Sequence, residues 1–161
     1  MGFLDKLMGK SQIEIAAPVS GEIVPISTVS DPVFAQEMVG KGVAIIPDDG
    51  NFYAPCDGTL VSLFPTGHAF AISSDDGAEV LVHIGIDTVK LEGRFFEIKA
   101  TQGERVKKGD LIVSVDLEGV KSENYEIVTP VIVSNPDKFS GIEKKDGRKT
   151  AGEAAILLIK K

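Results

Sequence analysis

The chain contains two histidines, His68 and His83, and both fall in one predicted β-hairpin. Apolar runs flank an Asp-Asp-Gly segment at 75–77, and Asp-Gly between such runs is a strong hairpin signal. With a two-residue loop, Phe70 pairs with His83, and His68 lies diagonally from His83 on the same face. Diagonal neighbours on a sheet are roughly 7–8 Å apart at the backbone, which two imidazoles can span. An odd loop would place the two histidines on opposite faces, because strand side chains alternate.

Two adjacent imidazoles suit phosphoryl transfer. A neutral imidazole nitrogen with a pKa near 6.5 is a good nucleophile at neutral pH. A second imidazole can donate a hydrogen bond to the phosphoryl oxygens and stabilise the charge in transit. The sequence has no glycine-rich nucleotide loop, so the donor would be another phosphoprotein rather than ATP. Such a site needs an exposed apolar rim on which partner proteins dock.

A zinc site is the alternative chemistry for the same residues. His68 and His83 supply half of the four ligands of a closed site, and Asp87 could add a third. Cys56 stands opposite Val19 in an internal repeat, which indicates packing rather than ligation. Two histidines therefore suit, at best, a zinc ion at an interface completed by another protein.

A second alternative is a swinging-arm carrier. The Gly-x-x-Val-x-x-Gly-Asp pattern at 103–110 resembles the turn of lipoyl and biotinyl carriers. Neither Lys107 nor Lys108 looks like the modified lysine of those carriers, which usually follows or precedes methionine or aspartate. We interpret the motif as architecture.

Length, net charge, cysteine count and the lengths of the apolar runs limit the class of protein. A length of 161 residues predicts one domain with a proper core. A net charge of −7 disfavours nucleic acid as a partner. Cys56 is the only cysteine, so no intrachain disulfide can form. No apolar run reaches transmembrane length. We expect a cytoplasmic protein.

The first eleven residues are expected to form a separate, flexible arm before a single domain at 12–161. Phe3, Leu4, Leu7 and Met8 share one face at helical spacing. Such a short amphipathic arm could make weak contact with a membrane surface through residues 1–10.

From residue 12 onward the pattern is β. Short apolar stretches rich in Val and Ile alternate with turn residues, and they predict strands at 13–17, 21–26, 42–46, 58–64, 70–73, 80–84, 95–100, 111–115, 131–134 and 155–159. Short helical turns are predicted at 32–39 and 117–122. This spacing predicts an all-β fold, an antiparallel sandwich in the form of a flattened barrel-sandwich hybrid.

An internal repeat supports two similar halves. The segment APVSGEIVPI at 17–26 aligns with APCDGTLVSL at 54–63, and Ala, Pro, Gly and Val are identical. In each copy a Pro-x-x-Gly turn leads into a strand.

Several stretches resemble the glucose-type IIA component of the bacterial sugar phosphotransferase system. The similarity spans roughly 12–160, and its most specific part is LVHIGIDTV at 81–89. It also includes FPTGHAF at 64–70, DPVF at 31–34, GKGVAI at 40–45 and TPVIVSN at 129–135. The opening MGFLDKL resembles the amphipathic leader of some free-standing members.

The resemblance implies an antiparallel β-sandwich and assigns unequal roles to the histidines. His83 matches the residue phosphorylated by the phosphocarrier HPr, which then passes the group to a cysteine of a sugar-specific IIB domain. His68 matches the histidine needed for onward transfer, and Thr66 matches the residue that orients it. Asp87 matches an acidic residue beside the site. Gly67 departs from the polar residue common at its position.

The resemblance also implies a partner-binding surface that includes Asp87 and a set of apolar residues. We call these residues the apolar rim: Val33, Phe34, Val39, Phe64, Leu81 and Val89. No cofactor is required by this chemistry. Enteric members of the family also regulate permeases and kinases according to their phosphorylation state, so a regulatory binding protein is the alternative function.

Overall fold

The computed structural model of the chain describes residues 12–153 and 155–161. The arm predicted for residues 1–11 and its membrane contact lie outside the described residues. Strands dominate this part of the chain, and no helix within it is long and apolar enough to cross a membrane. The strands are β1 (Gln12–Ala16), β2 (Gly21–Pro25), β3 (Lys41–Pro47), β4 (Asn51–Tyr53), β5 (Gly58–Leu63), β6 (Ala69–Ser74), β7 (Glu79–His83), β8 (Phe96–Ile98), β9 (Arg105–Val106), β10 (Leu111–Val115), β11 (Thr129–Val133), β12 (Gly141–Lys144), β13 (Gly147–Lys149) and β14 (Ala155–Lys160). The helical turns are η1 (Ile26–Thr28), α2 (Pro32–Ala35), η2 (Thr88–Leu91), α3 (Leu117–Ser122) and η3 (Pro136–Lys138).

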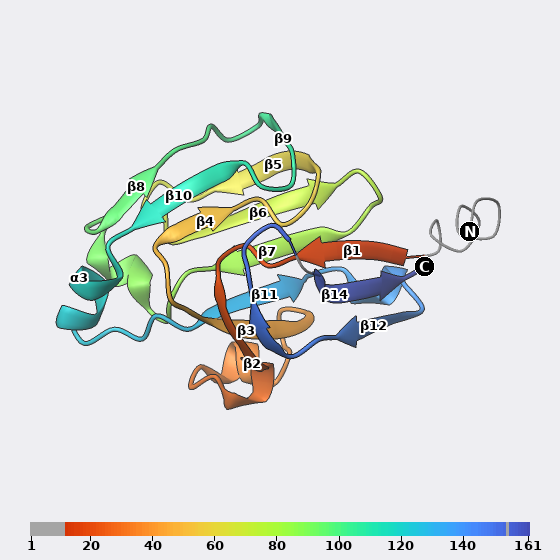
Figure 1. Cartoon of the computed structure of the whole chain (residues 1–161), viewed down its shortest axis with the longest axis horizontal. Helices are drawn as coiled ribbons and strands as arrows, with labels where there is room; N and C mark the ends of the chain where they lie inside the picture. Colours follow the sequence, from red (N-terminus) through yellow and green to blue (C-terminus); the bar gives the residue numbers. More distant parts are fainter. Residues whose placement is uncertain (1–11, 154) are drawn as a thin grey trace.

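These strands form one large sheet and two small ones (Figure 1). The large sheet has the order β13-β2-β3-β11-β7-β6-β5-β9, and the small sheets are β1-β14-β12 and β4-β10-β8. The main hydrophobic core contains residues from all three sheets, such as Ile15, Phe52 and Phe70. Apolar faces of antiparallel sheets are therefore buried against one another, which confirms the predicted antiparallel sandwich.

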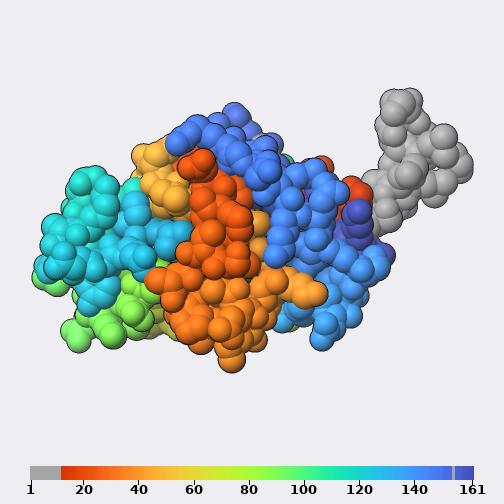
Figure 2. Space-filling view, turned by 90° about the horizontal axis from the view of Figure 1, so that it is seen from below, coloured from red at the N-terminus to blue at the C-terminus, as the bar shows by residue number. Residues whose placement is uncertain are grey.

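A second, smaller hydrophobic cluster covers the other face of the large sheet. Ile26, Val29 and Phe34 come from the segment between β2 and β3, and they pack against Ala44 and Ile132 in the sheet. Figure 2 shows this segment, in orange, at the lower middle of one face of the molecule. This cluster supports the histidine end of the hairpin β6–β7, because Leu81 of β7 packs against it.

The internal repeat is visible in the large sheet. Gly21 begins β2 and Gly58 begins β5, and each lies opposite a neighbouring antiparallel strand. A Cβ at Gly21 would lie 2.2 Å from the Ile46 carbonyl oxygen, and one at Gly58 would lie 2.2 Å from the Ser73 carbonyl oxygen. The glycine shared by the two copies is therefore required for the same close approach of strands.

All ten predicted strands are present, with shifts at their ends, and α3 covers the predicted range 117–122. The prediction of a helical turn over 32–39 was wrong in extent, because α2 ends at Ala35. Asp31 caps this turn by accepting a hydrogen bond from the Val33 N–H. Glu37 then adopts a left-handed conformation with φ 55°, which a continuing helix does not allow.

Candidate active site

The predicted register of the histidine hairpin was wrong. His83 pairs with Ala69, not with Phe70. The loop is a three-residue turn at 75–77, closed by a 2.8 Å hydrogen bond from the Ser74 N–H to the Ala78 carbonyl. Three-residue hairpin loops end on a residue in the left-handed region, and Gly77 supplies it with φ 96°.

The two histidine rings nevertheless lie together. Their centroids are 5.1 Å apart and the rings are nearly perpendicular, at 80°. His68 precedes β6 and follows Gly67, which has φ 76° in a turn closed by its N–H to the Phe64 carbonyl. Because His68 lies in this turn, strand alternation does not fix the direction of its side chain. The expected proximity of the rings is confirmed, but the register from which it was inferred is not.

His83 ends β7 and is held from one side by backbone. Its Nδ1 lies 2.7 Å from the Gly85 carbonyl oxygen. A carbonyl oxygen only accepts, so the neutral ring carries its proton on Nδ1 and leaves the Nε2 lone pair free. The Phe34 ring lies against the imidazole, with centroids 5.0 Å apart. His83 therefore presents one unprotonated nitrogen in a fixed orientation.

His68 is more deeply buried, with 4% of its surface exposed. Its Nδ1 is hydrogen-bonded to the Thr66 hydroxyl, as the predicted pairing of these two residues requires. The Phe64 ring meets the imidazole edge-on at 5.1 Å between centroids. Each histidine thus has one nitrogen engaged by a polar group and one aromatic ring packed against it.

Both imidazoles are neutral at physiological pH. Burial, together with a smaller effect of the neighbouring His83, lowers the pKa of His68 to about 4. Burial also lowers the pKa of His83. The hydrogen bond to Gly85 and the nearby carboxylates of Asp31 and Asp87 oppose that shift. The site therefore holds two uncharged nitrogen bases beside two acidic side chains.

The residues of the apolar rim differ in exposure. Val33, Val39, Phe64 and Val89 are exposed. Phe34 is buried and Leu81 is half-buried, and both pack in the second hydrophobic cluster. Met38, which the sequence did not mark, is the most exposed large apolar side chain among the described residues, at 70%. It was expected inside a helix over 32–39, whereas that helix ends at Ala35.

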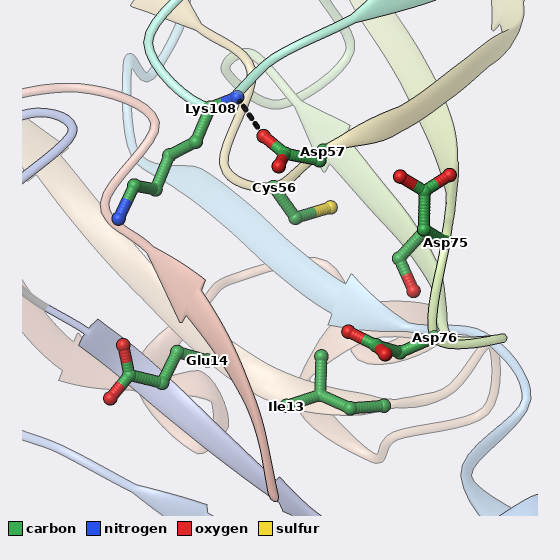
Figure 3. Close-up of a pocket in the computed structure, with 8 residues that line it drawn as sticks. Ile13, Glu14, Cys56, Asp57, Asp75, Asp76 and Lys108 are labelled. Atoms are coloured by element: carbon green, nitrogen blue, oxygen red, sulfur yellow. Dashed lines mark hydrogen bonds between the residues drawn. The ribbon is translucent and has the colours of Figure 1, made fainter. Parts of the chain in front are cut away.

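Cys56 precedes β5 and lies beside the turn of the β6–β7 hairpin, at the end away from the histidines. It lines a hollow of about 200 Å³ beside the 75–77 turn, together with Asp57 and Lys108 (Figure 3). Burial, with nearby Asp57 in support, raises the pKa of the thiol to about 12, and the side chain belongs to the main core. The interpretation of Cys56 as a packing residue is consistent with this position. Among the residues that the structure describes, no three His, Cys, Asp or Glu side chains are grouped to hold a metal, so Asp87 is not placed as a third ligand.

The fold and the site define a class: an antiparallel β-sandwich that presents two adjoining neutral imidazoles. A family model described as "phosphoenolpyruvate-dependent sugar phosphotransferase system, EIIA 1" matches residues 13–139. The glucose-specific EIIA component of Haemophilus influenzae is 43% identical, with 100% of both chains covered. The solved glucose permease IIA from Mycoplasma capricolum superposes with a TM-score of 0.84 at 37% identity, covering 91% of this chain and 95% of that one.

A longer relative carries the same unit. The β-glucoside-specific EIIBCA component of Bacillus subtilis is 43% identical over 90% of this chain, which spans 24% of that protein. The chain therefore belongs to the EIIA type 1 family of the sugar phosphotransferase system, and it is a phosphocarrier of that system. The relatives are named as components of the transfer chain, so the comparisons favour this function over a regulatory binding protein.

Proposed function

We propose that His83 carries the phosphoryl group on Nε2. The observation that carries this proposal is the 2.7 Å contact between His83 Nδ1 and the Gly85 carbonyl oxygen. This contact leaves Nε2 as the free nucleophilic nitrogen. The lowered pKa of His83 keeps that nitrogen unprotonated at neutral pH.

The transfer has two steps that balance without ATP. In the first, the N–P bond of a phosphohistidine on HPr breaks while the N–P bond to His83 Nε2 forms. In the second, a cysteine thiolate of a IIB domain attacks the same phosphorus, and the N–P bond to His83 breaks. The EIIBCA relative, in which an EIIA unit is part of a protein named for EIIB, supports IIB as the acceptor. With these proposed partners, we expect the reaction to take place in the cytoplasm.

In this proposal His68 contacts the phosphoryl group on His83 and not the phosphoryl donor HPr. We assign the Thr66 hydroxyl as donor to His68 Nδ1, which puts the ring proton on Nε2. That N–H can then donate to a phosphoryl oxygen on His83, whose ring lies 5.1 Å away. A neutral donor suits this role, because the lowered pKa of His68 prevents it from being charged near pH 7.

The docking surface consists of the exposed members of the apolar rim and the two carboxylates beside the site. Val33, Phe64 and Val89 offer apolar contact. Asp31 and Asp87 offer negative charge near His83. A partner with an apolar patch bordered by basic side chains fits this surface.

The histidine roles are tested by separate substitutions. With phosphoenolpyruvate, enzyme I and HPr, His83→Gln should acquire no acid-labile phosphate, because the nucleophile is gone. His68→Gln should still be labelled but should not pass the group to IIB. Labelling is followed with radioactive phosphate and by mapping the modified residue.

Circular dichroism of both variants is the control, because each variant should keep the fold of the parent. Labelling of His83→Gln at the rate of the parent would overturn the assignment. Normal delivery by His68→Gln would overturn the proposed role of His68 alone.

Zinc at this site is proposed only as part of a complex. The chain supplies two imidazoles, and each keeps one ring nitrogen free of protein hydrogen bonds in the described residues. A partner would have to supply the remaining ligands of a tetrahedral ion. Titration of zinc with and without a partner that bears a carboxylate at its docking surface separates this from simple protein association.

A further inference from the structure

The turn that follows β7 holds the carbonyl group on which the state of His83 depends. Gly85 adopts φ 77°, and its carbonyl accepts the hydrogen bond from His83 Nδ1. The preceding peptide also reaches the other histidine, because the Ile84 N–H donates to the His68 carbonyl at 2.7 Å. A shift of the Ile84–Gly85 backbone would therefore disturb both histidines.

Thr88 is the side chain that closes this turn. It is fully buried, with 0% of its surface exposed, and its hydroxyl donates to the Ile84 carbonyl at 2.5 Å. Its methyl group packs directly on Gly85, where a Cβ would lie 2.6 Å from Thr88 Cγ2. A backbone hydrogen bond from the Ile86 N–H to the Glu126 carbonyl, at 3.1 Å, holds the other side of the turn.

We propose that Thr88 is a positioning residue for His83, acting through the Ile84–Gly85 backbone; this rests on the proposed role of His83. The Thr88 hydroxyl fixes the Ile84 carbonyl, and the chain is thereby held with the Gly85 carbonyl facing His83 Nδ1. The hydrogen bond to one ring nitrogen decides which nitrogen carries the proton. Thr88 therefore keeps His83 in the form whose Nε2 is free.

The role needs a hydroxyl as well as bulk. Removing it leaves the buried Ile84 carbonyl without this partner, which costs free energy and favours movement of the turn. Once the Gly85 carbonyl moves away, His83 can populate both neutral forms, and only one of them has an unprotonated Nε2. The rate of phosphorylation should fall with the population of that form.

The test compares Thr88→Val with Thr88→Ser. Valine keeps the shape without the hydroxyl, and serine keeps the hydroxyl. Nitrogen NMR of chains labelled in histidine reports protonation at each ring nitrogen, and His68→Gln assigns the signals because the chain has two histidines. We expect a mixture of forms at His83 in Thr88→Val and the parent state in Thr88→Ser. Phosphorylation of Thr88→Val should be about two- to five-fold slower, in proportion to the competent fraction.

Thr129→Val is the matched control. Thr129 is also fully buried, and its hydroxyl donates to the Ile127 carbonyl at 3.0 Å. This variant loses an equivalent hydrogen bond and should leave the His83 ring state unchanged. If Thr88→Val does not fold, Thr88→Ala, which also relieves crowding at Gly85, takes its place.

Three results would overturn the proposal: an unchanged ring state in the variant lacking the hydroxyl, the same mixture in Thr88→Ser, or the same mixture in Thr129→Val. Absence of phosphorylation in the parent would instead contradict the proposed function. The NMR comparison would still decide whether Thr88 positions the ring.

Discussion

At the scale of single residues, His68 makes the stability of the fold depend on pH. Its pKa in the folded chain is about 4 because it is buried, below the ordinary value of 6.5. Between these values the unfolded chain binds a proton that the folded chain does not. The free energy of unfolding is therefore highest above pH 6.5 and falls as the pH drops toward 4. The loss from this residue is on the order of 3 kcal/mol.

Denaturant unfolding of the parent and of His68→Gln at pH 7 and pH 4 measures this effect. Glutamine does not titrate, and the carboxylates of both chains respond alike. Acidification should therefore lower the free energy of unfolding of the parent more than that of the variant, by about 3 kcal/mol. Equal losses in the two chains would show that His68 is not held neutral by the fold.

The sequence made the histidine pair predictable, because the two imidazoles can be recognised by type, whereas Thr66 was indicated only by the resemblance to the family. The groups that hold His83 could not be recognised in this way. One is the backbone carbonyl of Gly85, and its direction depends on a positive φ. The other is Thr88, because its hydrogen bond to the Ile84 carbonyl depends on the conformation of the turn and no sequence signal marks it.

At the scale of the elements, the close approach of β5 and β6 predicts that replacing Gly58 destabilises the fold. Gly58→Ala would place a Cβ 2.2 Å from the Ser73 carbonyl oxygen, so the strands must separate. We expect a loss of about 3 kcal/mol in the free energy of unfolding. Gly141→Ala in β12 is the matched control, because a Cβ there meets nothing within 4 Å. Thermal or denaturant unfolding compares them, and equal stability of the two variants would contradict the argument.

Strands with apolar alternation could be predicted, and those without it could not. β9 and β13 were missed because they are short and mostly exposed, so no buried face marks them. β4 and β12 were missed for a related reason, since each is a short strand in a small sheet. The hairpin register was wrong because Asp-Gly is compatible with a loop of two or three residues, and only the neighbouring strands select between them.

At the scale of the whole molecule, the sandwich followed from the spacing of strands and from the repeat, but the division into three sheets did not. β1 pairs with β14, so that Gln12 lies opposite Lys160. Such long-range pairing depends on which buried faces meet after folding, and no local pattern encodes it. The rim around the histidines likewise comes from segments far apart in the chain, such as α2 and η2.

The assembled rim predicts which surface the phosphoryl donor touches. Val89 and Val61 are both 49% exposed, but Val89 belongs to the apolar rim and Val61 lies on β5 outside it. Substitution of either by Asp adds the same charge to a chain of net charge −7. A buried carboxylate at a docking surface loses hydration, so Val89→Asp should raise the concentration of phospho-HPr needed for half-maximal labelling by about ten-fold, which corresponds to roughly 1.4 kcal/mol. Val61→Asp should leave it unchanged. Initial rates of labelling at a series of HPr concentrations measure both variants. Equal effects of the two variants would mean that the added charge, rather than contact at the rim, weakens the encounter. That result would contradict docking of the donor at the apolar rim.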